Sequence, residues 1–208
     1  LKLRGLPADE YAESSYAPKA LYNLGGMAIE DGETQSAIQS FREIVNEYPD
    51  DRMAKKAKKK LKQLSLVGRK APELQVSEWL GTEPIELKQY LGNVVLLEFW
   101  TTWCPHCRKQ LPHMKEIYKK YADKGLTLIT ISRNDKDKGQ TTEKMKQFME
   151  ENEIPYPVGI DDNRKTTKDY ISGSIPAVAL IDRKGIIRWR SHPGYLKNET
   201  IEALLTEK

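Results

Sequence analysis

The sequence predicts an α/β fold with a mixed central sheet flanked by helices, preceded by a small all-α segment of helical repeats. Apolar residues recur at helical spacing over the first third of the chain, and part of that pattern returns at a constant offset of 37 residues. Beyond it, strands alternate with helices of about ten residues, which is typical of parallel βαβ units. A late pair of strands joined by a turn adds antiparallel pairing. We therefore expect a helical domain over residues 1–64 and a sheet domain over residues 65–208.

The composition is that of a folded chain without membrane spans. The 208 residues are 38% hydrophobic and 31% charged, which separates the chain from disordered proteins of low hydrophobicity. Neither the apolar run from Val94 to Leu97 nor any other uninterrupted apolar run is long enough to span a membrane. The net charge of +4 is small for this length, so no nucleic-acid partner is expected.

Three helices are expected in the first domain, at residues 16–30, 34–47 and 51–64. Their pattern resembles tetratricopeptide-like repeats of the outer-membrane-assembly type over about residues 8–64. The residues that carry this resemblance are Tyr22-Asn23-Leu24-Gly25, Ala37, Phe41, Tyr48-Pro49-Asp50 and Ala57. One complete unit is fewer than the three or so repeats that a free solenoid needs. We therefore expect the segment to pack on its neighbour or to belong to a longer array.

The helical domain is expected to dock proteins, because nothing in it resembles catalytic chemistry. Amphipathic contact surface typical of recognition faces is supplied by a tyrosine set: Tyr11, Tyr16, Tyr22 and Tyr48. The alternative is a helical cap that buries one face of the sheet domain. The lysine run from Lys55 to Lys62 is interpreted as a solvated helix face that suits the helix dipole, with a docking surface as the alternative.

The sheet domain is predicted from the change of periodicity after a linker at about residues 65–72. A turn between short strands is expected at residues 79–85. Residues 94–100 are β-branched and aromatic and are expected to form a buried central strand. The further expected helices lie at residues 111–121, 142–151, 166–171 and 198–205, and the further strands at residues 126–131, 177–181 and 186–190.

The only two cysteines form the motif Cys104-Pro105-His106-Cys107, between a strand and a helix. Such a close pair stabilises little as a structural disulfide, so it is predicted to serve redox chemistry. Its position puts Cys104 at a helix N-terminus, where unpaired backbone N–H groups and the helix dipole stabilise a thiolate. Pro105 suits the first helical turn because its missing N–H is no loss there.

Further motifs accompany the cysteine pair. They are Val67-Gly68-Arg69-Lys70-Ala71-Pro72, Leu87-Lys88-Gln89-Tyr90-Leu91-Gly92-Asn93, Phe99-Trp100-Thr101-Thr102-Trp103 and Ser174-Ile175-Pro176-Ala177. With them, residues 67–208 resemble the thioredoxin superfamily, and within it the TlpA/ResA-like thiol-disulfide oxidoreductases. The resemblance implies a thioredoxin-like fold and disulfide exchange with protein substrates, without a cofactor.

The resemblance also implies roles for single residues. Cys104 matches the exposed nucleophile and Cys107 the buried resolving thiol. Pro176 matches a cis-proline that faces the pair, and Ile175 then offers backbone groups to an extended substrate. Trp103 and Pro105 complete the expected substrate-binding set.

Glu98 and His106 are expected to tune the two thiols. Glu98 lies inside the apolar strand, where an unpaired carboxylate is expensive to bury. It matches the buried acid of thioredoxin, which implies a raised pKa and a role in moving the Cys107 proton; the alternative is a strand residue paired with a lysine or a water. His106 matches the Pro-His dipeptide of DsbA-like oxidants, which favours an oxidant, whereas the surrounding TlpA/ResA-like motifs favour a reductant. Gln110 stands where ResA-like members often carry an acid.

Three other functions fit parts of the pattern. A thioredoxin-fold peroxidase would use a cysteine after a strand, but Leu97 stands where the usual peroxidase loop has proline. A metal site could use Cys104, Cys107, His106, His113 and His192 as ligands. The sequence contains no second paired motif of the kind typical of zinc sites, so no metal is expected. A non-catalytic interaction protein that relies on its repeats is disfavoured by the intact cysteine pair.

The expected location is extracytoplasmic, in a bacterial periplasm or tethered outside the cytoplasm. The chain starts at Leu1 with no leader or anchor pattern, which is interpreted as a processed form. Protein thiols and disulfides are the expected substrates, with apocytochrome c among them, and a redox partner would recycle the active site. Fold analogy does not choose the substrate.

Overall fold

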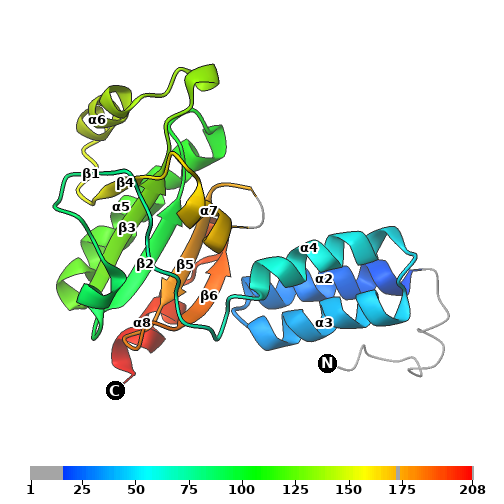
Figure 1. The fold of residues 1–208 in the computed structure, drawn as a ribbon. Helices are drawn as coiled ribbons and strands as arrows, with labels where there is room; N and C mark the ends of the chain where they lie inside the picture. Colours follow the sequence, from blue (N-terminus) through cyan, green and yellow to red (C-terminus); the bar gives the residue numbers. More distant parts are fainter. Residues whose placement is uncertain (1–15, 172–173, 208) are drawn as a thin grey trace. The chain divides into compact units, whose positions relative to one another are not determined.

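The computed structural model of the chain describes residues 16–171 and 174–207 (Figure 1). The chain divides into two compact units, residues 1–65 and 66–208, and each is described by itself. The first copy of the expected repeat, at residues 10–20, lies mostly outside the described residues, as does Tyr11.

The described part of the first unit, residues 16–65, contains three helices: α2 (Ala17–Glu30), α3 (Thr34–Glu47) and α4 (Arg52–Leu64). These bounds lie within one residue of the predicted ones. The helices pack around their own apolar core, centred on Phe41 and Ile44, which are fully buried. Gly25 permits the close approach of α2 to α3, because a Cβ atom there would lie 2.7 Å from the Phe41 ring.

The second unit is built on a six-stranded sheet in the order β1-β4-β3-β2-β5-β6. The strands are β1 (Glu78–Leu80), β2 (Val94–Phe99), β3 (Leu126–Ser132), β4 (Val158–Ile160), β5 (Ala177–Ile181) and β6 (Ile187–Ser191). Parallel pairing joins β2, β3 and β4, and the other three pairings are antiparallel. The mixed sheet predicted from the sequence is confirmed.

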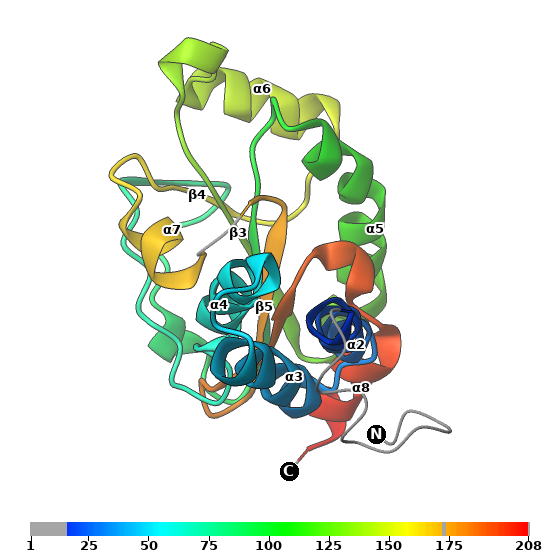
Figure 2. The ribbon, with the colours of Figure 1, turned by 90° about the vertical axis from the view of Figure 1, so that its right-hand side faces the viewer.

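Helices cover both faces of this sheet. They are α5 (Pro105–Tyr121), α6 (Thr142–Glu151), α7 (Lys165–Tyr170) and α8 (Asn198–Thr206), and Figure 2 shows α5 and α7 on opposite sides of the strands. Successive residues of β2 point to opposite faces. Val94 and Leu96 therefore join the core under α5, α6 and α8, and Val95 and Leu97 join the core under α7.

Three elements differ from the expected ones. The helix expected at residues 111–121 begins earlier, at Pro105, in agreement with the expected place of Cys104 at a helix N-terminus, and it contains Pro112. No second strand follows the turn at residues 79–85, because Glu86 and Gln89 form a reciprocal capping box that starts the short 3₁₀ helix η1 (Leu87–Tyr90). Strand β4 was not expected at all.

Candidate active site

Cys104 caps the N-terminus of α5 with its sulfur atom. Its backbone is extended, and the Cys107 backbone N–H donates a hydrogen bond to the Cys104 sulfur at 3.2 Å. Both cysteines are free thiols in this structure. The amide and the positive end of the helix dipole both favour negative charge on the Cys104 sulfur.

The loop before β5 covers Cys104 from the other side. The Ile175–Pro176 peptide bond is cis, as expected, and the Ile175 carbonyl oxygen lies 4.0 Å from the Cys104 sulfur. The expected exposure of Cys104 is wrong: because this loop covers the residue, only 5% of its surface is accessible, against 2% for Cys107.

Glu98 lies beneath the pair, on the face of β2 that packs against α5. Its register partners are Thr130 on β3 and Val178 on β5, and the residue is 4% exposed. Burial without a cationic partner raises its pKa to about 8. Burial also raises the pKa of Cys107, and the nearby Glu98 charge raises it further. The two groups therefore compete to stay protonated in one buried region.

Tyr156 brings a hydroxyl group into the same buried region. The residue is 2% exposed, and among the described residues its hydroxyl has no hydrogen-bond partner. Burial raises its pKa, and the nearby Glu98 charge adds to the effect. Sequence analysis did not select Tyr156, since an isolated tyrosine in an apolar stretch carries no motif.

Trp103 is partly buried under an excursion of the chain between β3 and α6, residues 133–140. The guanidinium of Arg133 lies 5.5 Å from the centre of the Trp103 ring, and the Lys138 ammonium lies 5.8 Å from it. These distances are typical of cation–π contacts. The expected substrate-binding residue Trp103 is thus part of a charged rim beside Cys104.

Gln140 ties this excursion to the loop that carries Cys104. It is 2% exposed, and its side-chain oxygen accepts hydrogen bonds from the Thr102 backbone N–H, at 2.8 Å, and from the Thr102 hydroxyl. Its amide donates to the Ser132 hydroxyl and to the Arg133 carbonyl. Sequence analysis also missed Gln140, because its partners lie up to 38 positions away.

The other expected site residues lie at the start of α5. Pro105 and His106 are both exposed in its first turn. Burial, with a smaller contribution from nearby His106, lowers the pKa of His192, which precedes the short 3₁₀ helix η4 (Pro193–Tyr195). Across residues 16–171 and 174–207, no three His, Cys, Asp or Glu side chains gather in a way that could hold a metal ion.

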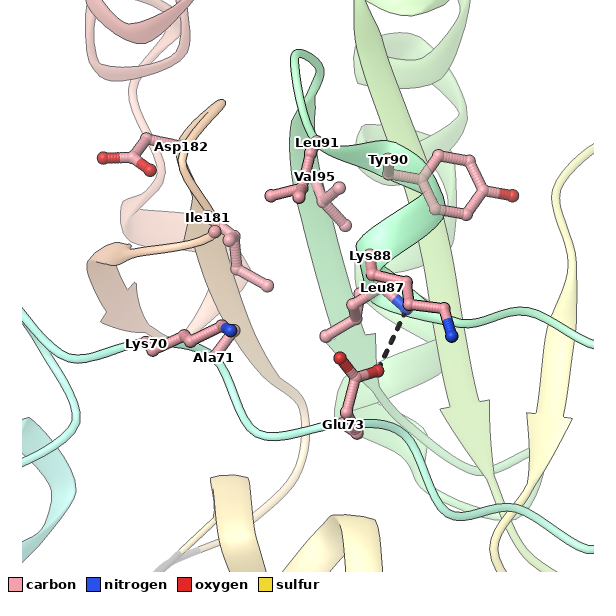
Figure 3. Close-up of a pocket in the computed structure, with 11 residues that line it drawn as sticks. Lys70, Ala71, Glu73, Leu87, Lys88, Tyr90, Leu91, Val95, Ile181 and Asp182 are labelled. Atoms are coloured by element: carbon pink, nitrogen blue, oxygen red, sulfur yellow. Dashed lines mark hydrogen bonds between the residues drawn. The ribbon is translucent and has the colours of Figure 1, made fainter.

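A small hollow on the opposite face of the sheet has no link to the cysteines (Figure 3). Its volume of about 40 Å³ offers room for a few water molecules. At its edge the Leu87 backbone N–H donates a hydrogen bond of 3.2 Å to the Glu73 carboxylate, drawn as a dashed line. In the part of the chain that the structure describes, every helix is too short or too polar to cross a membrane.

Comparison with curated proteins finds relatives of the second unit. Thiol-disulfide oxidoreductase ResA of Bacillus cereus (strain ZK / E33L) is 37% identical over 119 residues, which make up 57% of this chain and 65% of ResA. This chain thus spans less than two thirds of that relative. The thioredoxin-like protein YneN of Bacillus subtilis (strain 168) is 30% identical over 138 residues, 66% of this chain and 78% of YneN.

Solved structures and a family description agree with this placement. A thiol-disulfide isomerase from Corynebacterium glutamicum is 25% identical with a TM-score of 0.55, over 66% of this chain and 98% of that one. The thioredoxin-like superfamily protein SPOA0173 is 24% identical with a TM-score of 0.61, and the match covers 67% of this chain and 97% of SPOA0173. This likeness supports a thioredoxin-like fold. The description of the AhpC/TSA family matches residues 67–190, more than half of the chain. The chain therefore belongs to the AhpC/TSA family and has a thioredoxin-like fold.

Proposed function

We propose that this protein is a thiol-disulfide oxidoreductase that exchanges disulfides with protein substrates through Cys104 and Cys107. One observation carries the proposal: the Cys104 sulfur lies between the Cys107 amide, at 3.2 Å, and the Ile175 carbonyl of the cis-proline loop, at 4.0 Å. An extended substrate that pairs with the Ile175 backbone would place its own sulfur against Cys104. The names of the ResA relatives support the same activity.

The exchange proceeds in two steps that balance atoms and electrons. The Cys104 thiolate attacks one sulfur of a client disulfide, so that a mixed disulfide forms and the second client sulfur leaves as a thiolate. Cys107 then loses its proton and attacks the Cys104 sulfur, which releases the first client sulfur. The client disulfide is reduced by two electrons and the Cys104–Cys107 pair is oxidised. Run in reverse, the same steps oxidise a client dithiol.

Glu98 is proposed as the group that accepts the Cys107 proton. A carboxyl with a pKa of about 8 is ionised in about one molecule in ten at pH 7. Because the pKa of Cys107 is raised as well, the thiol holds its proton until an acceptor is near. A buried carboxylate on the same face of the sheet supplies that acceptor.

Two serine variants test the proposal with a synthetic peptide disulfide as substrate. Cys104→Ser should abolish exchange, and Cys107→Ser should accumulate a mixed disulfide with the peptide that mass spectrometry detects on Cys104. Exchange that survives in Cys104→Ser would overturn the assignment. Rapid consumption of hydrogen peroxide by the reduced protein, with no reduction of the peptide disulfide, would favour the peroxidase alternative.

The proposed setting is outside the cytoplasm, with exported proteins as clients, apocytochrome c among them, and a second redox protein as the recycling partner. The resemblance of residues 67–208 to TlpA/ResA-like proteins supports it. The test is protease treatment of intact spheroplasts of the source organism: digestion of the native protein supports the location, and protection until lysis contradicts it. The helical unit is proposed to dock the client.

A further inference from the structure

Three segments around the Cys104 sulfur contain no carboxylates, and two of them carry cations. They are the start of α5 with the loop before it (residues 99–115), the cis-proline loop and β5 (174–181), and β6 with η4 (189–197), which packs on α5. No Asp or Glu occurs in any of the three. Arg108 and Lys109 are exposed in the first turns of α5. Glu98, which is buried beneath the two cysteines, has a pKa of about 8 and is therefore mostly neutral at pH 7.

The excursion at residues 133–140 is a fourth segment close to Cys104, and it contains acidic as well as basic residues. Asp135 pairs with Arg133 at 3.3 Å and also accepts a hydrogen bond from the Lys138 backbone N–H at 3.2 Å. Its charge is thus balanced within the excursion. Beside it, both oxygens of Asp162 accept hydrogen bonds from Asn134, at 2.9 and 3.1 Å.

Lys138 keeps an uncompensated charge at this wall. Its side chain is exposed, its ammonium lies 5.8 Å from the centre of the Trp103 ring, and among the described residues it has no ion pair. Trp103 directly precedes Cys104, so a client cysteine held at Cys104 brings its neighbouring residues to this ammonium. Two acids oppose its field: the exposed Asp137, next to Lys138 in sequence, and Asp162, whose hydrogen bonds to Asn134 leave its charge in place.

We propose that Lys138 on Trp103, together with Arg108 and Lys109, forms a cationic client site, in which Lys138 binds an acidic side chain adjacent to the client's cysteine. Preferred clients are therefore protein segments with Asp or Glu next to a disulfide-forming cysteine. The inference rests on the proposed function and names its substrate class. Opposite charges at such a site act mainly by raising the rate of productive encounter.

The test compares two peptides that differ only in charge. Each contains one internal disulfide, flanked by two Glu in the first and by two Lys in the second. The rate constant for reduction by the protein is divided by that for reduction by dithiothreitol, which removes the intrinsic reactivity of each peptide. We expect the Glu peptide to react about tenfold faster at low ionic strength, and the advantage to shrink in high salt.

Charge variants locate the effect. Lys138→Glu should slow the Glu peptide about threefold and speed the Lys peptide, as expected for one exposed charge pair. Lys136→Glu is the matched control, because Lys136 lies in the same excursion and is also exposed, whereas the cations that stack on Trp103 among the described residues are Arg133 and Lys138; it should change both rates much less. Asp137→Asn should increase the preference for the Glu peptide.

Hydroxyethyl disulfide, which is uncharged, separates the two levels of the argument. The rate of each variant on the two peptides is therefore divided by its own rate on this disulfide. Equal normalised rates for the two peptides, or equal effects of Lys136→Glu and Lys138→Glu, would overturn the cationic client site while leaving the oxidoreductase intact. Failure of the native protein to reduce hydroxyethyl disulfide or either peptide would overturn the proposed function itself.

Discussion

Replacing Glu98 by glutamine should stabilise the protein at neutral pH and impair its proposed chemistry. A glutamine side chain keeps the shape of the native one and removes its charge. The native carboxyl is 4% exposed and has no cationic partner to offset the burial of its charge. The variant therefore loses a group that is expensive to ionise in the fold.

The expected magnitude follows from the pKa of Glu98, which rises from 4.5 to about 8 on burial. An acid with a raised pKa binds its proton more tightly in the folded state than in the unfolded state. Its contribution to stability is full below pH 4.5 and is lost as the pH rises to about 8. At about 1.4 kcal/mol per tenfold change, the loss is about 3 kcal/mol at pH 7 and about 5 kcal/mol above pH 8.

The assay is denaturant unfolding of both proteins, fully reduced, at several pH values between 4.5 and 8.5. Cys107 and Tyr156, whose pKa values the Glu98 charge raises, stay protonated in both proteins up to pH 7, and the other titrating groups cancel in the difference of the unfolding free energies. We expect that difference to grow with pH by about 3 kcal/mol between pH 4.5 and 7, in favour of Glu98→Gln. A constant difference over this range would refute the buried, unpaired carboxyl. Release of the mixed disulfide should be slower in the variant, and an unchanged rate between pH 6 and 8 would refute its role as proton acceptor.

Four further outcomes are expected. Iodoacetamide near pH 6 should modify Cys104 before Cys107, and the reverse order would contradict the assignment of the nucleophile. His106→Gly should make the Cys104/Cys107 couple more reducing in a glutathione buffer, by about 30 mV for each 1.4 kcal/mol of lost thiolate stabilisation. An unchanged potential would mean that the helix N-terminus, and not His106, sets the potential. Gln140→Ala should lower the unfolding free energy by about 1–3 kcal/mol, because it leaves buried hydrogen-bonding groups without partners. Native-like stability would contradict a structural role for the hydrogen bonds between Gln140 and the Cys104 loop. Removal of residues 1–65 should preserve reduction of hydroxyethyl disulfide and weaken activity on a protein client, whereas aggregation would favour the helical cap.

The elements that the sequence predicted well have a strong local signal. The apolar stripes of the helical unit follow one period over many residues, and β2 is a nearly continuous run of apolar residues. Strand β4, at Val158–Ile160, is three residues long and follows Pro157, so it offers no period to detect. It exists because β3 and β1 pair with its two edges, which is a tertiary cause.

The candidate site divides in the same way. Cys104, Cys107 and Pro176 were predictable because each belongs to a motif, and the structure brings them together. The exposure of Cys104 was not predictable, because the Ile175 carbonyl that covers it comes from a loop 71 positions away. Gln140 gave no signal either, since a buried amide is recognised only once its partners are placed.

The two cysteines lie in opposite electrostatic surroundings although two residues separate them. Cys104 receives a backbone N–H at the helix terminus and faces segments without carboxylates, so negative charge is favoured on its sulfur. Cys107 is buried above Glu98, burial raises the pKa of its thiol, and Glu98 is proposed to accept its proton. Release by Cys107 should therefore accelerate between pH 7 and 8, as Glu98 ionises toward its pKa of about 8. Stopped-flow mixing with a peptide disulfide resolves this phase, and a release rate that stays constant over this range in the native protein would contradict the division of roles.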